Sequence, residues 1–297
     1  MNDETLSKQQ KATRKRLFRP SRWLYVLMAV FILYSVTLIF PMLWLLYNSV
    51  KSKTEFFLQP WAFPNNPFKY MSNYLTVFKD FNVGMMFFNS VFLSLLCPLV
   101  SIFFHCCTAY AYARHNFKLK PLVYTLAIIP MVVSIAGTLP TQYKLINTLG
   151  IYDNIFLYLI LSAAGTGYNF MLISSVFENM SNAYKEAALI DGAGNWRIFL
   201  TIYIPQAFNL ILPLYILGVI STWNDYASPF LFLPSHPTLA VGIKRIGDLI
   251  SSGSQQYGGD WPKLFATMIL SILPILVLFI AFQKRIMKMT SFGGLKE

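Results

Sequence analysis

Residues suited to acid–base catalysis, metal binding or thiol chemistry are few in this chain of 297 residues, and they lie far apart. The histidines and cysteines are His105, His115, His236, Cys97, Cys106 and Cys107. No histidine has a companion ligand one helical turn away, and the cysteines lack the CxxC spacing of a metal or redox site. The phosphate-binding pattern GxxxxGK followed by Ser or Thr is absent. We therefore predict no metal, no cofactor and no enzymatic activity in this chain.

One carboxylate, Asp225, falls inside a long apolar segment, where an ionisable group is a functional candidate by default. If a helix begins at Gln206, Asp225 lies about 28 Å along it, at roughly 1.5 Å per residue. That depth is close to the far face of a bilayer, where water can solvate a carboxylate. A structural role in pairing or capping the helix end is therefore open beside a role in ligand binding.

The elements that carry these residues are long apolar helices. The chain is 56% hydrophobic and 12% charged, which is too apolar for an ordinary soluble domain. Its apolar residues form runs of about 20, the length that crosses a bilayer as a helix. The runs are roughly 23–49, 85–112, 121–142, 155–177, 206–231 and 263–283. We predict an all-α polytopic membrane protein with six transmembrane helices, in which internal prolines are tolerated.

The distribution of Lys and Arg predicts the orientation. Twice as many of these residues lie on the side of the two termini as on the opposite side. Basic residues favour the cytoplasmic side, so both termini are predicted to be cytoplasmic. The tail 1–22 contains Arg14-Lys15-Arg16 and adds to the net charge of +12; we expect it to face anionic headgroups rather than nucleic acid. The remainder, 23–297, is predicted to form the membrane domain.

A short helix is predicted within 178–205, the longest expected cytoplasmic loop between spans. Ser181 or Asn182 can cap its start. Glu186 lies in the first turns of this helix, where a negative charge suits the helix dipole. Gly192 can take the left-handed conformation that stops a helix. The loop is therefore expected to be structured rather than a plain connector.

One face of this short helix is built from small and apolar residues. Ala183, Ala187 and Ile190 recur at helical spacing. Such a face buries little against its own fold, but it suits a groove on another protein. An interfacial helix lying in the membrane is the alternative. A second helix is expected to follow, with Trp196 and Phe199 as apolar anchors.

The same loop resembles the EAA loop of ABC importer permeases. The matching residues are Glu186-Ala187-Ala188, then Gly192, then Ile202-x-Ile204-Pro205. Ile204 is the one departure, since the family usually has Leu there, and it keeps the apolar character. In that family the loop is a coupling helix that docks in a cleft of the ATP-binding subunit, which holds ATP and Mg²⁺. The resemblance implies these docking residues: Ala183, Glu186, Ala187, Ala188, Ile190, Asp191 and Gly192.

Three further stretches are similar to carbohydrate-type permeases of binding-protein-dependent importers, the family of the smaller maltose permease. They are Trp223-Asn224-Asp225-Tyr226 followed by Pro229, Pro237 to Gly242, and Ser291 to Lys296. The resemblance implies a type I ABC importer permease fold in a bacterial cytoplasmic membrane. It also implies a carbohydrate substrate of oligosaccharide size and three partners: a second permease subunit, an ATPase dimer and a solute-binding protein.

Sugars are bound by aromatic faces and by amide or carboxylate groups. By this criterion the candidate substrate pathway contains Tyr168, Asn169, Trp223, Asn224, Asp225 and Tyr226. Plain packing is an equal alternative for Tyr168 and Asn169, because Gly165-Thr166-Gly167 beside them allows close helix approach. In the maltose family the other permease builds most of the sugar site, so few direct contacts are expected from this chain.

The expected outer loop, 232–262, has a polar, glycine-bearing tip that is longer than a hairpin needs. By resemblance this tip corresponds to a loop that enters the solute-binding protein and competes for its sugar-binding groups. The implied contact residues are Ser254, Gln255, Gln256, Tyr257 and Gly258. A plain connector is the alternative.

Two other functions stay open at this level. An ABC permease for a different polar solute would share the loop pattern. A secondary transporter driven by protons or sodium usually keeps carboxylates or histidines at mid-membrane, and the sequence offers none that is well placed.

Overall fold

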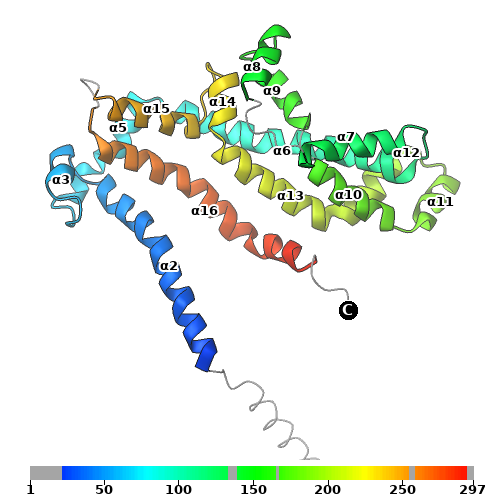
Figure 1. Ribbon diagram of the computed structural model, residues 1–297, viewed down its shortest axis with the longest axis horizontal. Helices are drawn as coiled ribbons and strands as arrows, with labels where there is room; N and C mark the ends of the chain where they lie inside the picture. Colours follow the sequence, from blue (N-terminus) through cyan, green and yellow to red (C-terminus); the bar gives the residue numbers. More distant parts are fainter. Residues whose placement is uncertain (1–21, 133–138, 165–166, 254–257, 293–297) are drawn as a thin grey trace, which may run out of the picture.

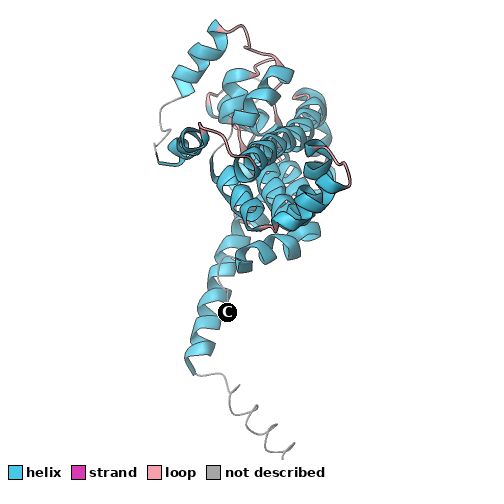
Figure 2. Ribbon diagram, turned by 90° about the vertical axis from the view of Figure 1, so that its right-hand side faces the viewer, coloured by secondary structure: helices cyan, strands magenta, loops and turns pink. Residues whose placement is uncertain are grey.

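The structure is a computed structural model that describes residues 22–132, 139–164, 167–253 and 258–292. Over these residues it contains helices joined by loops and no strands, which confirms the predicted all-α class (Figure 2). The helices are α2 (Arg22–Ser49), α3 (Lys53–Leu58), α4 (Pro67–Tyr70), α5 (Ser72–Asp80), α6 (Val83–Arg114), α7 (Lys120–Val132), α8 (Leu139–Thr148), α9 (Ile155–Leu161), η1 (Ser162–Ala164), α10 (Gly167–Asn179), α11 (Asn182–Ile190), α12 (Asn195–Ile198), η2 (Phe199–Tyr203), α13 (Ile204–Asn224), α14 (Ala227–Phe232), α15 (Leu239–Ser251) and α16 (Trp261–Phe292).

Four described segments are long and apolar enough to cross a membrane as single helices. They are Trp23–Ser49, Val83–Arg114, Asn195–Asn224 and Trp261–Arg285. The third predicted segment contains α7 and α8, which lie on either side of residues outside the described part of the chain. The fourth contains α9, η1 and α10. The described helices in these two segments are each shorter than a bilayer crossing needs.

The fifth predicted segment, 206–231, differs at both of its ends. Helical structure begins earlier, because α12, the π-helix η2 and α13 follow one another without a break. It also stops earlier, at Asn224, since Asp225 is extended with φ −73° and ψ 114°. The residues beyond form the separate helix α14. The length of an apolar run in the sequence predicts how many residues avoid water, but it does not predict where the helix ends or changes direction within the run.

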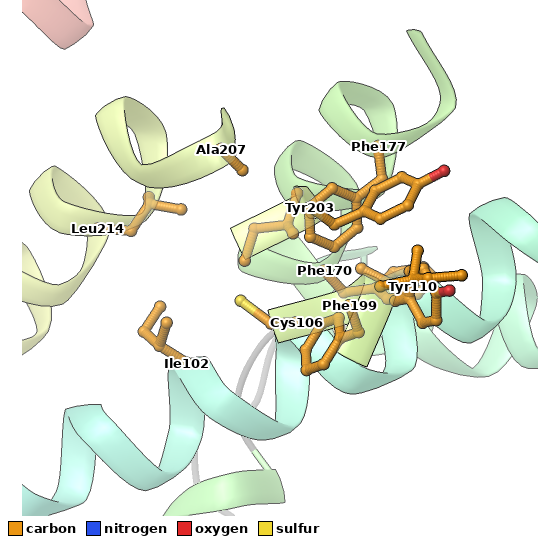
Figure 3. Close-up of a cluster of buried hydrophobic side chains, with 12 residues drawn as sticks. Ile102, Cys106, Tyr110, Phe170, Phe177, Phe199, Tyr203, Ala207 and Leu214 are labelled. Atoms are coloured by element: carbon orange, nitrogen blue, oxygen red, sulfur yellow. The ribbon is translucent and has the colours of Figure 1, made fainter. Parts of the chain in front are cut away.

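The main core lies where α6, α10, η2 and α13 meet, and four aromatic side chains fill its centre (Figure 3). The Tyr110 ring lies 4.9 Å from Tyr203 and 5.1 Å from Phe199, measured between centroids. The Phe177 ring lies 5.5 Å from Tyr203. Each such pair adds about 0.5–1.5 kcal/mol beyond area burial. This cluster fixes α10 and η2 against one end of α6.

Helix α2 leaves the rest of the molecule, and the views in Figures 1 and 2 agree on this. None of the residues in its most apolar window is buried. Its packing is concentrated near its last turns, where the Trp44 ring lies 5.4 Å from Phe265 of α16 and 5.7 Å from Trp61. An apolar helix with this much bare surface requires lipid or another chain around it.

The segment between α2 and α6 is ordered into three short helices, α3, α4 and α5. Lys51 is fully buried and donates to the carbonyl oxygen of Gln59 at 2.9 Å. Burial lowers the pKa of Lys51, and the charge of Glu55 opposes that shift. Trp61 is 69% exposed. Figure 1 places α3 and α5 at one end of the long axis and α11 and α12 at the other.

Candidate functional site

Helix α11 and the residues that flank it form the first candidate site. Ser181 is the N-cap, and its hydroxyl accepts a hydrogen bond from the amide of Ala183 at 3.3 Å. The helix ends at Ile190, with Asp191 as the C-cap. The predicted start by Ser181 is confirmed. Glu186 is exposed in the middle of the helix, and the first turn contains no acidic residue, so the expected interaction of Glu186 with the helix dipole is not supported.

The end of α11 is a Schellman motif. The amide of Ala193 donates to the carbonyl oxygen of Ala188 at 2.9 Å, and the amide of Gly192 donates to that of Leu189 at 3.1 Å. Gly192 has a φ of +75°, the left-handed conformation in which a side chain is strained. The predicted stop at Gly192 is therefore confirmed, and the sequence signal for it was local.

No residue of α11 is buried. Ala183, Glu186 and Ala187 are exposed, and Ala188 is half-buried against the main core. Ile190 is 86% exposed, an unusual position for a branched apolar side chain beside a helix end. The helix thus has exposed small and apolar side chains. It lies at one end of the molecule (Figure 1). Such a surface can contact another protein without desolvating many charges.

The predicted aromatic anchors of the next helix need one correction. Phe199 is 1% exposed and belongs to the main core, but Trp196 is 66% exposed. Trp196 lies one turn before Phe199 and on the same face, but it stands in the first turn of α12, beyond the buried residues Ile198 and Phe199. The Trp196 ring instead contacts the edge of Phe199, with centroids 5.8 Å apart.

The second candidate site is the junction between α13 and α14. Trp223 is buried, and its indole Nε1 donates to the carbonyl oxygen of Ser271 at 3.2 Å. The exposed Asn224 amide donates to Ile220 within its own helix at 2.8 Å. Tyr226 is 49% exposed. The predicted group of four neighbours therefore does not share one surface: Trp223 packs on α16, and Asn224 and Tyr226 face outward.

Asp225 caps the start of α14. Its Oδ1 atom accepts hydrogen bonds from the amides of Ala227 at 2.9 Å and Ser228 at 3.2 Å. Free amides at a helix start are the usual partners of an aspartate at this position. This geometry supports the capping alternative for Asp225, while leaving its other oxygen for further contacts.

An open cavity of about 340 Å³ lies beside this junction. Its polar lining residues are Gln142, Tyr158, Ser162, Thr222, Asp225 and Ser228. They come from α8, α9, η1, α13 and α14, so distant segments of the chain meet here. Asp225 was predicted from the sequence, but Gln142 and Tyr158 were not, because no local pattern predicts which distant side chains meet in the folded chain. Hydroxyl, amide and carboxylate groups together suit a polyhydroxylated ligand.

Tyr168 and Asn169 lie elsewhere, in the first turn of α10, and neither lines this cavity. Tyr168 is 44% exposed. Gly167 beside it is buried, and a side chain there would lie 1.7 Å from the carbonyl oxygen of Ala127 in α7. The predicted close helix approach is therefore confirmed for Gly167. The structure does not bring Tyr168 together with Asp225.

The predicted loop contacts Ser254, Gln255, Gln256 and Tyr257 lie outside the described residues. The residues that follow are anchored to α3, since the Lys53 ammonium donates to the carbonyl oxygen of Gly258. Lys263 forms an ion pair with Asp260 at 3.0 Å. The base of the loop is thus held at the α3 end of the molecule.

Asp153 connects the α8–α9 turn to the α14–α15 turn next to the cavity. Its Oδ1 atom accepts from the amide of Ser235 at 3.0 Å and lies 3.7 Å from Nδ1 of His236. Partial burial raises the pKa of Asp153, but the bonds from Ser235 and the charge of His236 outweigh it, so the pKa is lowered. The carboxylate therefore stays ionised at neutral pH and joins the two turns.

Replacing Asp225 with alanine is expected to destabilise the fold by about 0.5–2 kcal/mol, because α14 loses its cap. Asp225→Asn keeps a capping oxygen and should unfold close to the wild-type temperature. Thermal unfolding in detergent measures both. Asp248→Ala, which removes an exposed carboxylate of α15, is the control. An asparagine variant as unstable as the alanine variant would contradict the capping role.

Comparison with known proteins places these features in context. Residues 106–290 match the family model described as binding-protein-dependent transport system inner membrane component. The chain is 28% identical over 266 residues to the diacetylchitobiose uptake system permease protein NgcG of Streptomyces coelicolor, covering 89% of this chain and 86% of that protein.

Two solved structures share the fold. The first is a chain of a bacterial ABC transporter involved in the import of the acidic polysaccharide alginate, with a TM-score of 0.74 and 22% identity over 90% of this chain and 97% of that one. The second is a chain of a bacterial alginate ABC transporter in complex with a periplasmic protein that holds an alginate pentasaccharide. Its TM-score is 0.60 and its identity 17%, covering 93% of this chain and 97% of that one.

Proposed function

The chain belongs to the family of binding-protein-dependent transport system inner membrane components, and from this premise we propose that it is a permease subunit of a bacterial ABC importer for a carbohydrate of oligosaccharide size. NgcG serves diacetylchitobiose uptake, and the transporters with the same fold carry alginate. The substrate is therefore a saccharide, delivered by a solute-binding protein of the kind seen in the alginate complex. The chain forms part of a membrane pathway and performs no catalysis of its own.

The observation that carries this proposal is the exposed α11 with its closed Schellman end. A nine-residue helix with no buried residue gains little from its own fold. Its outward surface of Ala183, Ala187 and Ile190 suits a cleft on an ATPase subunit, which binds ATP and Mg²⁺. Closure of the ATPase dimer would then pull on α11, and the pathway would open to the opposite side of the membrane.

In this proposal the chain crosses the membrane six times, with both termini and the α11 end in the cytoplasm. The four long apolar helices account for four crossings, and the helices of the third and fourth segments complete the other two. The α3 end then faces outward. The predicted outer loop 232–262 contains the thirteen-residue helix α15, so only part of it is a loop. The contact of Lys53 with Gly258 holds the end of this segment on the side where the solute-binding protein would dock.

The cavity beside the α13–α14 junction combines an apolar wall with several polar side chains, and it is the part of this chain best suited to a sugar. Asp225, Gln142 and Tyr158 line it, while Asn224 and Tyr226 lie on adjacent surface. Trp223 holds the end of α13 against α16 through its hydrogen bond to the carbonyl oxygen of Ser271. Tyr168 and Asn169 would act on a separate stretch of the pathway, next to the α7–α10 contact.

Docking is tested with a charge placed on the exposed end of α11. Ile190→Asp should leave membrane insertion intact but reduce the ATPase recovered with the purified complex, along with ATP-dependent sugar uptake in proteoliposomes. Leu119→Asp is the matched control, because Leu119 is 61% exposed and lies on the same side of the membrane in this proposal. Equal recovery of ATPase with both variants would refute docking at α11. Uptake driven by an ion gradient without ATPase would indicate a secondary transporter.

A further inference from the structure

The last residue of α6 makes a set of contacts that docking alone does not explain. The Arg114 guanidinium donates to the carbonyl oxygens of Phe177 and Met180, at the end of α10. It also donates to Oδ1 of Asn182, the first residue of α11. In return, the Lys185 ammonium of α11 donates to the carbonyl oxygen of Arg114 at 3.0 Å. One residue therefore joins the ends of three helices.

A fourth element is part of the same arrangement. The Arg114 guanidinium lies over the Tyr203 ring of η2, 5.1 Å from its centroid. Tyr203 is 1% exposed and sits in the aromatic core beside Tyr110 (Figure 3). A guanidinium is planar and has five donors in a fixed geometry, so it can bond several acceptors and stack on a ring at once. A lysine ammonium is a point charge on a flexible stem and cannot reproduce this arrangement.

These polar contacts matter for the position of α11, because the helix has few packing contacts with the rest of the chain. No residue of the helix is buried, and its apolar attachment to the core comes from Ala188 and from Ala193 just beyond it. Helix α6, by contrast, runs 32 residues to Val83 at the far end of the molecule and packs along both α10 and α13. The chain itself links α11 to α10 through residues 180–181 and to α12 through residues 191–194. A displacement of α11 reaches α6, which lies far from it in sequence, through Arg114 and Lys185.

We propose that Arg114, together with Lys185, is the positioning residue that transmits displacement of α11 to α6. The inference rests on the proposed function, since it requires an ATPase that moves α11. Coupling of two sites through a contiguous set of hydrogen bonds and packed helices has a measurable consequence. Weakening the contact should let ATP be hydrolysed without the matching movement of the pathway.

The test measures sugar transported per ATP hydrolysed by the complete complex in proteoliposomes. The solute-binding protein is supplied outside, carrying the saccharide that supports wild-type uptake. Arg114→Lys should assemble with both partners, yet this ratio should fall by roughly 2- to 30-fold. Lys118→Ala, which removes an exposed basic residue of the neighbouring loop, should leave the ratio unchanged. A merely structural Arg114 would lower complex yield and thermal stability at constant ratio, and that result would overturn the inference.

A second pair of variants decides the matter if Arg114→Lys does not assemble. Asn182→Ala removes the side-chain acceptor on α11 and leaves Ser181 to cap the helix. Asn179→Ala removes an exposed asparagine that bonds within α10. A lower ratio for Asn182→Ala alone supports the inference, and equal ratios overturn it. A wild-type complex without ATP-dependent uptake would instead refute the proposed function itself.

Discussion

Gly192→Val is expected to weaken the docking of the ATPase on this chain while leaving the membrane helices folded. Gly192 has a φ of +75°, and nothing lies within 4 Å of the position that a Cβ atom would take. The penalty is therefore backbone strain rather than collision, about 1–2 kcal/mol for an L-residue in this conformation. The native end of α11 should become roughly 5- to 30-fold less populated relative to a rearranged one. ATPase recovered with the complex, and uptake, should fall together.

Gly194→Val is the matched control for this variant. Gly194 is also exposed with open space around it, but its φ of −72° and ψ of 160° suit valine. It should behave as wild type. Gly192→Asn should fall between the two, because asparagine tolerates the left-handed region. Identical behaviour of Gly192→Val and Gly194→Val would show that the helix end does not matter for docking.

Gly167→Ala is expected to be the most destabilising single change at a glycine of the described chain. The added Cβ atom would lie 1.7 Å from the carbonyl oxygen and 2.6 Å from the carbonyl carbon of Ala127. Backbone atoms cannot move aside as a flexible side chain can, so α7 and α10 must separate. Overpacking of this kind costs about 3 kcal/mol or more. Thermal unfolding should show a large loss, and little complex should assemble.

Gly247→Ala provides the comparison, because this glycine lies in the interior of a helix, α15, where no close backbone approaches it. Its added Cβ atom would be 3.9 Å from Leu264, an ordinary contact. Alanine there should be neutral, or stabilising by about 0.5–1 kcal/mol, since glycine costs that much in a helix interior. If Gly167→Ala unfolds at the temperature of Gly247→Ala, the close approach of α7 and α10 is wrong.

The features that could be predicted from sequence are those with local causes. The Ser181 cap and the Gly192 stop depend on residues within a few positions, and both lie where the sequence predicted them. Gly167 was likewise identified by its small size beside an apolar helix. The overall helical class followed from the length of the apolar runs.

Features with distant causes escaped the sequence. The π-helix η2 forms where Phe199 and Tyr203 both enter the aromatic core, and no pattern within five residues predicts that. The end of α13 at Asn224 depends on Asp225 turning to cap a second helix. No local pattern distinguishes Arg114, because its five partners lie at least 60 residues away in sequence. Residues from α8 and α9 reach the cavity only through the tertiary fold.

The bare surface of α2 also bears on how this chain is made. Trp44 in α2 packs on Phe265 in α16, and these two residues lie near opposite ends of the chain. During synthesis from the N-terminus, α2 emerges early and α16 last among the described helices. The contact between them closes after nearly the whole chain is present. Until then α2 is held in the bilayer by lipid and by its contacts with the segment that follows it, such as that of Trp44 with Trp61, and attachment of α16 marks completion of the subunit.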